Sequence, residues 1–149
     1  MRMPAALALV LLAACSEAPL ETKADPGNAG QVALGAKVYV QHCAACHGAK
    51  LEGQPDWRSR LPNGRMPAPP HDESGHTWHH TEEVLFGITK EGLVPGKYAP
   101  PGYTSDMPGF GNVLSDAEIW AVLAYIKSHW KTPALLEARE EMVRNAKRR

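Results

Sequence analysis

The sequence lacks the features that nucleic-acid binding and membrane spanning require. Lys plus Arg and Asp plus Glu each number 16 in the 149 residues, so there is no excess of positive charge to attract nucleic acid. The longest run of Ala, Leu and Val, residues 5–14, has ten members. As a helix it would reach only about half the thickness of a bilayer's hydrocarbon core. Aromatic residues make up only 7% of the chain, so the polypeptide has few large flat side chains for a core.

Convincing β-strands are also missing from the pattern. The chain has 13 Gly and 13 Pro, which favour loops and turns between a few short helices. Its length is that of one domain, and 44% of its residues are hydrophobic, which is enough for a single core. We therefore expect an all-α fold with long loops rich in Pro and Gly.

Cysteine is scarce, and each of the three cysteines has a predicted use. Cys15 follows the apolar run directly, in Leu12-Ala13-Ala14-Cys15, which resembles a bacterial lipoprotein signal. That resemblance implies cleavage before Cys15 and a lipid on its sulfur. We expect an exported protein, lipid-anchored on the periplasmic side of a bacterial membrane. An ordinary secretory signal with an incidental cysteine is the alternative.

The other two cysteines belong to the stretch Cys43-Ala44-Ala45-Cys46-His47. Two cysteines separated by two residues and followed directly by histidine form the attachment signature of c-type haem. Thiols about one helical turn apart can add to the two vinyl groups of a haem, and the next imidazole can then bind the iron. The sequence thus predicts one covalent haem c, whose flat apolar surface would also serve the core.

Three other interpretations of this motif have less support. A dithiol redox motif is expected beside a strand–helix–strand pattern, which the chain does not show. A zinc site needs two further ligands. His76 and His80 are a suitably spaced pair, but they lie much farther from Cys46 than the second pair does in a zinc finger. A chance match in a structural loop is the third alternative.

Helical patterns lie on both sides of the motif. A helix is expected over about 28–42, where Gly35 would be tolerated if another helix approaches closely. Thr81 can cap a short helix. Ser115 and Glu118 form a capping box before a run with helical apolar periodicity.

The stretch 48–80 is irregular and rich in Pro and Gly. A loop this long in a small domain is usually functional or disordered, and wrapping a haem edge would order it. Five side chains are candidates to cover that edge or to pair with haem propionates: Trp57, Arg58, Arg60, Arg65 and Trp78. Four histidines, of the kind that suits copper or zinc, lie within ten residues: His71, His76, His79 and His80. A polar surface loop is the plainer interpretation of these histidines.

From Ala29 to Trp130 the chain resembles a class I cytochrome c. The likeness rests on the following residues: Gly35, Tyr39, Cys43 to His47, Met107-Pro108, Phe110, Gly111, Val122 and Tyr125. It implies the cytochrome c fold, in which the first and last helices cross at small and aromatic residues such as Gly35 and Tyr125. It also implies that His47 and Met107 are the two axial ligands of the iron.

A second Met-Pro pair, Met66-Pro67, competes for the role of distal ligand. Met66 follows the motif by 19 residues of Pro-rich chain, and no helix comes directly after it to anchor it. Met107 lies just before the capped helix that is expected to pack on the helix bearing the haem cysteines. Met107 is therefore the predicted ligand, and Met66, a histidine or an open position are the alternatives.

Iron bound by both His47 and Met107 has no free position for a substrate. This favours electron transfer over catalysis, and a methionine ligand also raises the reduction potential. We expect an electron carrier that serves redox partner proteins and is not itself an enzyme. One alternative is a haem relay subunit of a larger membrane oxidoreductase, and another is a copper-handling protein that uses the histidines of 71–80.

The predicted organisation has four segments. They are a signal peptide (1–14), a flexible polar tether (15–27), a cytochrome c domain (28–131) and a charged, solvated helical extension (132–149).

Replacement of Cys15 tests the predicted lipid anchor. Each methylene buried in a bilayer contributes about 0.8 kcal/mol, so several acyl chains hold a protein durably. Cys15→Ala should therefore release haem-bearing protein from membranes or block its processing, whereas Ser16→Ala should do neither. Membrane fractionation with haem staining is the measurement. Equal membrane retention of the two variants would show that Cys15 does not carry the anchor.

Overall fold

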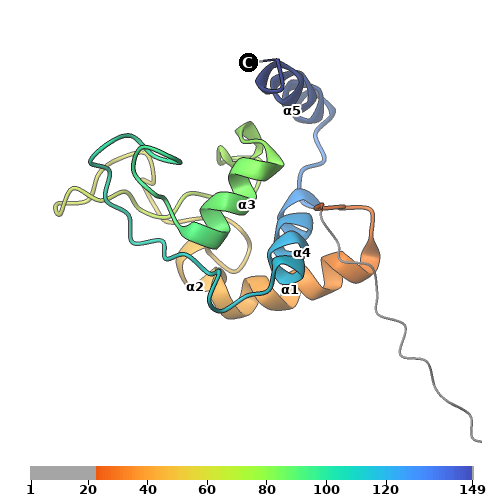
Figure 1. Cartoon of the computed structure of the whole chain (residues 1–149), viewed down its shortest axis with the longest axis horizontal. Helices are drawn as coiled ribbons and strands as arrows, with labels where there is room; N and C mark the ends of the chain where they lie inside the picture. The colour runs from red at the N-terminus through yellow and green to blue at the C-terminus, as the bar shows by residue number, and fades with distance from the viewer. Residues whose placement is uncertain (1–22, 149) are drawn as a thin grey trace, which may run out of the picture.

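The computed structural model describes residues 23–148; the predicted signal peptide and the lipid site Cys15 lie outside this range. Within it the chain is helical and forms no strand, only an isolated bridge between Pro95 and Ala99 (Figure 1). The elements are α1 (Ala29–His42), α2 (Ala44–His47), the 3-10 turn η1 (Thr77–His79), α3 (Glu82–Glu91), α4 (Asp116–Lys127) and α5 (Pro133–Ala146). The predicted all-α class is confirmed.

Two helices begin at the caps that the sequence predicts, and α1 has a cap where its start is expected. The side chain of Asn28 accepts a backbone hydrogen bond at the start of α1, and that of Thr81 does the same for α3. Ser115 and Glu118 form both halves of the capping box of α4. These bonds satisfy amide groups that the first turn of a helix would otherwise leave unpaired.

Helices α1 and α4 cross in close contact, as Figure 1 shows. Gly35 of α1 lies at the crossing, where a Cβ would overlap the carbonyl oxygen of Ala121 and come within 2.8 Å of the Tyr125 Cβ. The glycine therefore lets the two backbones touch. This is the close approach that the sequence predicts for Gly35.

The core lies along this crossing and extends toward the haem motif. Tyr39 is fully buried on α1, with its ring centroid 5.3 Å from that of Tyr125 on α4. Its hydroxyl donates to the Gly48 carbonyl at 3.0 Å, just beyond the motif. The buried side chains around it are Val38, Ile119, Val122, Leu123, Ile126 and Trp130. The core thus fixes the end of α2 through a hydrogen bond from a buried tyrosine as well as through the chain.

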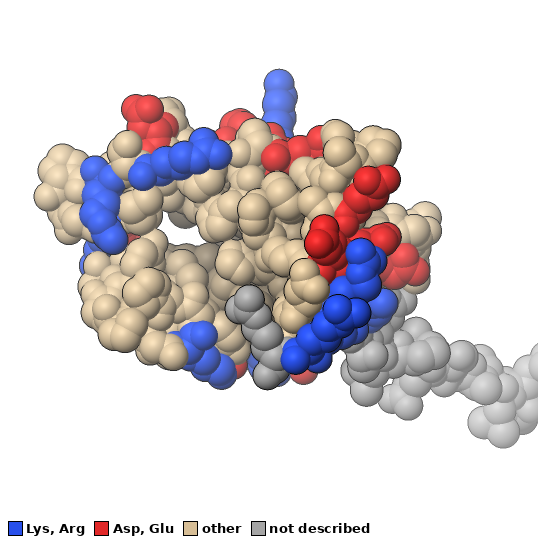
Figure 2. Space-filling model, turned by 90° about the horizontal axis from the view of Figure 1, so that it is seen from above, with Lys and Arg blue, Asp and Glu red and all other residues tan. Residues whose placement is uncertain are grey.

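Apart from η1 and α3, the chain between α2 and α4 is loop. Backbone bonds fold the first loop back on itself: the Gln54 amide donates to the Ala68 carbonyl at 2.9 Å, and the Leu61 amide to the Arg65 carbonyl at 2.8 Å. Figure 2 shows a hollow on the side of the molecule that these loops form, with Lys and Arg side chains near its edge.

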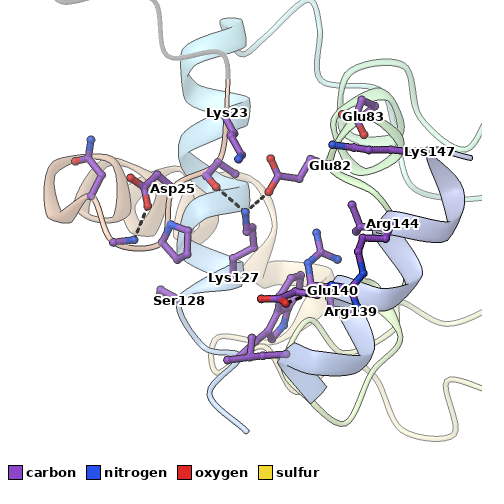
Figure 3. Close-up of a pocket in the computed structure, with 17 residues that line it drawn as sticks. Lys23, Asp25, Glu82, Glu83, Lys127, Ser128, Arg139, Glu140, Arg144 and Lys147 are labelled. Atoms are coloured by element: carbon purple, nitrogen blue, oxygen red, sulfur yellow. Dashed lines mark hydrogen bonds and ion pairs between the residues drawn. The ribbon is translucent and has the colours of Figure 1, made fainter. Parts of the chain in front are cut away.

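Residues 23–27, which the sequence assigns to the flexible tether, are packed against the domain. Ala24 is buried, and its carbonyl accepts a hydrogen bond of 2.6 Å from the Lys127 ammonium. Lys127 also pairs with Glu82, and Figure 3 shows this pair inside a cleft bordered by α5. The packed domain therefore begins before residue 28, because Lys127 of α4 and the Gln31 side chain of α1 hold the incoming backbone.

Helix α5 forms as predicted, but one of its residues is not solvated. Arg139 is 8% exposed, and its guanidinium donates to the carbonyls of Trp78 and His80 at 2.6 and 2.7 Å. It also lies 4.9 Å from the centre of the Trp130 ring. Arg139 thus attaches the charged extension to η1. No helix in the range 23–148 has the length and apolar character needed to cross a bilayer.

The close approach at Gly35 predicts that Gly35→Ala destabilises the domain. Alanine favours a helix over glycine by about 1 kcal/mol, but overpacking a tight contact costs about 1–3 kcal/mol, and here the obstacle is rigid backbone. We expect a net loss, measured by denaturant unfolding of the haem-bearing protein. Gly30→Ala in the same helix is the control, because its Cβ would meet nothing closer than 3.4 Å. Equal stability of the two variants would contradict the prediction.

Candidate functional site

Cys43, Cys46 and His47 lie on one turn of chain where α1 ends and α2 begins. The Cys43 amide donates to the Tyr39 carbonyl at 2.9 Å and closes the last turn of α1. The Cys46 and His47 amides donate in turn to the Cys43 carbonyl, at 3.1 and 2.9 Å. The two cysteines are not joined in a disulfide, and Cys43 is half-buried whereas Cys46 is exposed. The turn therefore gives the thiol spacing that attachment to two vinyl groups requires.

The His47 imidazole is buried and is held at one of its two nitrogens. Its Nδ1 lies 2.8 Å from the Pro69 carbonyl oxygen. Since a carbonyl can only accept, Nδ1 carries the proton and Nε2 keeps its lone pair. Burial lowers the pKa of His47, although the bond to Pro69 opposes the shift, so the ring is neutral at pH 7. A neutral imidazole with a free Nε2 fits an iron ligand.

The loop after the motif returns to it and brings Pro69 into place. The Gly53 amide donates to the His47 carbonyl at 2.8 Å, and the His71 amide donates to the Leu51 carbonyl at 2.8 Å. Gly53 has a positive φ of 69°, and a Cβ there would come within 2.7 Å of the Pro69 carbonyl carbon. The sequence pattern places this loop near the haem edge, but nothing in it singles out Pro69 as the partner of His47.

The cysteines do not have the character of a redox dithiol. Burial, with a smaller contribution from Cys46, raises the pKa of the Cys43 thiol to about 11. Dithiol oxidoreductases lower the pKa of their attacking cysteine so that it is a thiolate near neutral pH. Cys43 therefore remains protonated, and the structure gives the dithiol interpretation no support.

The four histidines of 71–80 are spread over different contacts. His71 lies against the haem motif, whereas His76 and His79 are in contact with tryptophan rings, at centroid distances of 5.3 and 3.7 Å. The rings of His80 and His76 are arranged edge to face, with their centroids 5.5 Å apart. Within residues 23–148 no group of three His, Cys, Asp or Glu residues could hold a metal ion. The zinc and copper interpretations thus gain no support from this part of the chain.

Met107 is half-buried in a loop whose C-terminal side is fixed on α3. The amides of Phe110 and Gly111 donate to carbonyls in the last turn of α3, each at 2.9 Å. Gly109 lies against the same turn, where a Cβ would meet the Glu91 backbone at 2.6 Å. The loop is therefore held on α3 from just beyond Met107.

The other side of this loop is held by arginines of the first loop. Arg65 forms an ion pair with Asp106, and the Arg60 guanidinium lies 5.8 Å from the centre of the Tyr103 ring. Both charged groups of the ion pair are partly exposed. Because Arg65 precedes Met66 and Asp106 precedes the other candidate methionine, this pair links the two Met-Pro segments.

A buried donor in η1 also fits a haem. The Trp78 indole nitrogen is buried and has no hydrogen-bond partner within the described range. A buried donor without a partner costs stability, so an acceptor from outside the polypeptide is expected. The carboxylates of a haem are acceptors of this kind.

The family of the chain follows from comparison with known proteins. Residues 32–130 match the family model of cytochrome c. The chain belongs to the cytochrome c family. Its cofactor is covalent haem c, its fold is the cytochrome c fold, and Cys43 and Cys46 stand in the attachment motif of that cofactor.

One curated relative is a thiosulfate dehydrogenase of Stutzerimonas stutzeri (strain A1501). It is 28% identical to this cytochrome c over 125 residues, which are 80% of this chain and 35% of the relative. The chain therefore spans about a third of the length of that relative. No solved structure gives a significant match.

The ion pair in front of Met107 predicts a local effect of Asp106→Asn. Partly exposed ion pairs stabilise by about 0.2–1 kcal/mol, so opening of the loop should increase by up to about fivefold. Amide hydrogen exchange of residues 103–107 measures this opening, and high salt should produce the same change in the unmodified protein. Glu140→Gln, which breaks the exposed Arg144–Glu140 pair on α5, is the control. Unchanged exchange in the Asp106 variant would mean that the pair does not hold the loop.

Proposed function

We propose that this cytochrome c is a single-haem electron carrier whose iron is bound by His47 and Met107. The observation that carries the proposal is the state of His47, which is buried and neutral, with Nδ1 bound to Pro69 and Nε2 free. It directly follows Cys46, so covalent attachment brings the free nitrogen to the metal. The haem supplies one-electron chemistry, and the protein supplies the ligands and their fixed positions.

Several features support Met107 over Met66 as the second ligand. The backbone just beyond Met107 is bonded to the last turn of α3, and the loop leads into α4. A thioether held in this way moves little between oxidation states. Two protein ligands leave the iron without a position for substrate, which suits transfer of electrons rather than catalysis.

We propose that the carrier meets its redox partner proteins at the surface around Cys46. Cys46 is one of the two attachment points of the haem, so a partner that docks there would lie close to the cofactor. The position of Trp78 suits a second task, because its buried indole N–H can donate to a haem carboxylate and hold that end of the cofactor inside the protein.

We also propose that the protein works on the periplasmic side of a bacterial membrane, held by a lipid on Cys15. The apolar run that ends at Cys15 supports this location. The domain is packed from residue 23 onward, so only the eight residues 15–22 would separate it from the lipid, a span of at most about 30 Å. The haem domain would then stay close to membrane-bound partners.

A second candidate is a haem relay within a larger oxidoreductase. It is favoured by the likeness of 80% of the chain to part of a thiosulfate dehydrogenase. Anaerobic mixing of the ferric protein with thiosulfate distinguishes the two candidates. Reduction of the haem by thiosulfate at catalytic rates would favour a role in that chemistry, whereas reduction only by a protein donor favours the carrier.

The ligand assignment predicts different outcomes for two methionine variants. Met107→Ala should lower the reduction potential, abolish the weak sulfur-to-iron absorption of the oxidised protein and let cyanide bind rapidly, because the sulfur no longer closes the iron. Met66→Ala should do none of these. Visible spectroscopy, a redox titration and cyanide mixing are the measurements. If the two variants behave the other way round, Met66 is the ligand.

A further inference from the structure

His71 is fixed by three hydrogen bonds although it lies outside any helix. Its backbone amide donates to the Leu51 carbonyl at 2.8 Å, and its carbonyl accepts from the Trp130 indole at 2.9 Å. Its ring Nδ1 lies 2.8 Å from the Thr77 hydroxyl. Backbone and ring are therefore tied to the loop after the motif, to the chain beyond α4 and to η1.

The His71 ring lies flat against the ring of His47. The two centroids are 3.9 Å apart, and the planes differ by 23°. The rings of His71 and of Tyr39, on α1, are arranged edge to face, with centroids 6.2 Å apart and an interplanar angle of 73°. One face of the candidate iron ligand is thus covered by a ring that is itself held in place.

This contact restrains a motion that the hydrogen bond to Pro69 does not fully control. The bond at Nδ1 determines which nitrogen of His47 faces the metal. An imidazole bound through Nε2 can still turn about the bond to the iron, which changes the direction of its plane. A flat, fixed neighbour on one face blocks this rotation, as groups around a metal ligand generally orient it.

We propose that His71 is a positioning residue that sets the plane of the His47 imidazole. The proposal rests on the proposed role of His47 as an iron ligand and adds the element that orients it. Pro69 and His71 act together, because they are two residues apart in one segment: the first fixes the tautomer of His47 and the second fixes its rotation.

Two substitutions separate the ring face of His71 from its hydrogen bond. His71→Phe keeps a flat ring and loses the bond to Thr77, whereas His71→Gln can keep that bond and loses the ring. The Thr77 hydroxyl also donates to the Pro70 carbonyl at 3.3 Å, so it retains a partner in both variants. His79→Gln, an exposed histidine of the same segment, is the control. His71→Leu replaces the Gln variant if that one does not accumulate with haem.

The plane of an axial imidazole controls the splitting of the iron d orbitals, which electron paramagnetic resonance reads as g values. In ferric, haem-bearing protein, we expect the largest g value and the order of the haem methyl proton resonances to change in His71→Gln. Both should remain as in the unmodified protein in His71→Phe and in His79→Gln.

The proposal is overturned if His71→Gln keeps the unmodified g values, or if His71→Phe departs from them as far as the Gln variant does. Failure of the underlying ligand assignment has a separate signature. A high-spin ferric signal in the unmodified protein would refute the proposed pair of ligands, whereas a low-spin signal that is indifferent to His71 refutes only its positioning role.

Discussion

The contact between α1 and α4 at Gly35 is the constraint on which the haem site depends. Without a side chain at this point the backbones touch, and the buried residues on either side of the contact fix the angle between the helices. Helix α1 ends at His42, directly before Cys43, and α4 begins shortly after the loop of Met107. The two sides of the proposed iron site therefore both originate at one crossing, and a shift of one helix against the other would move them apart.

The two sides of the proposed iron site, at His47 and at the loop of Met107, are held by contacts of different strength. On the His47 side, partly buried hydrogen bonds from Tyr39 and Trp130 connect the motif and His71 to the helix core. The loop of Met107 is fixed on α3 beyond the methionine. Before it the contacts are a partly exposed ion pair, a cation–π contact of Arg60 with Tyr103 and a local bond from the Met107 amide to the Ser105 hydroxyl. Exposed ion pairs stabilise little in water. The side that carries His47 thus has both the covalent attachment and the tighter packing. We expect the loop of Met107 to open locally at a lower free-energy cost.

Local signals in the sequence were enough for the helices and the attachment motif. Caps and apolar periodicity depend on neighbours three or four residues away, so the starts of α1, α3 and α4 could be predicted. The role of Gly35 could be predicted because only close approach justifies a glycine in mid-helix. Pro69, His71 and Arg139 could not be predicted, since their partners lie far along the chain and depend on the path of a long loop. The packing of Ala24 could not be predicted for the same reason, because its partner Lys127 follows 103 residues later.

The distribution of buried side chains indicates that the haem forms part of the hydrophobic core of the folded domain. Between residues 48 and 114 the buried hydrophobic residues other than proline are Leu51, Leu85 and Leu114, whereas α4 alone contributes more than these. The polypeptide of these long loops thus buries few apolar groups of its own to offset the conformational entropy of ordering them. The flat apolar surface of a covalent haem supplies what the sequence lacks, and its carboxylates suit the unpartnered Trp78 donor. The scarcity of aromatic residues and the presence of the attachment motif are therefore related, because the haem supplies the flat apolar surface that completes the core of this domain.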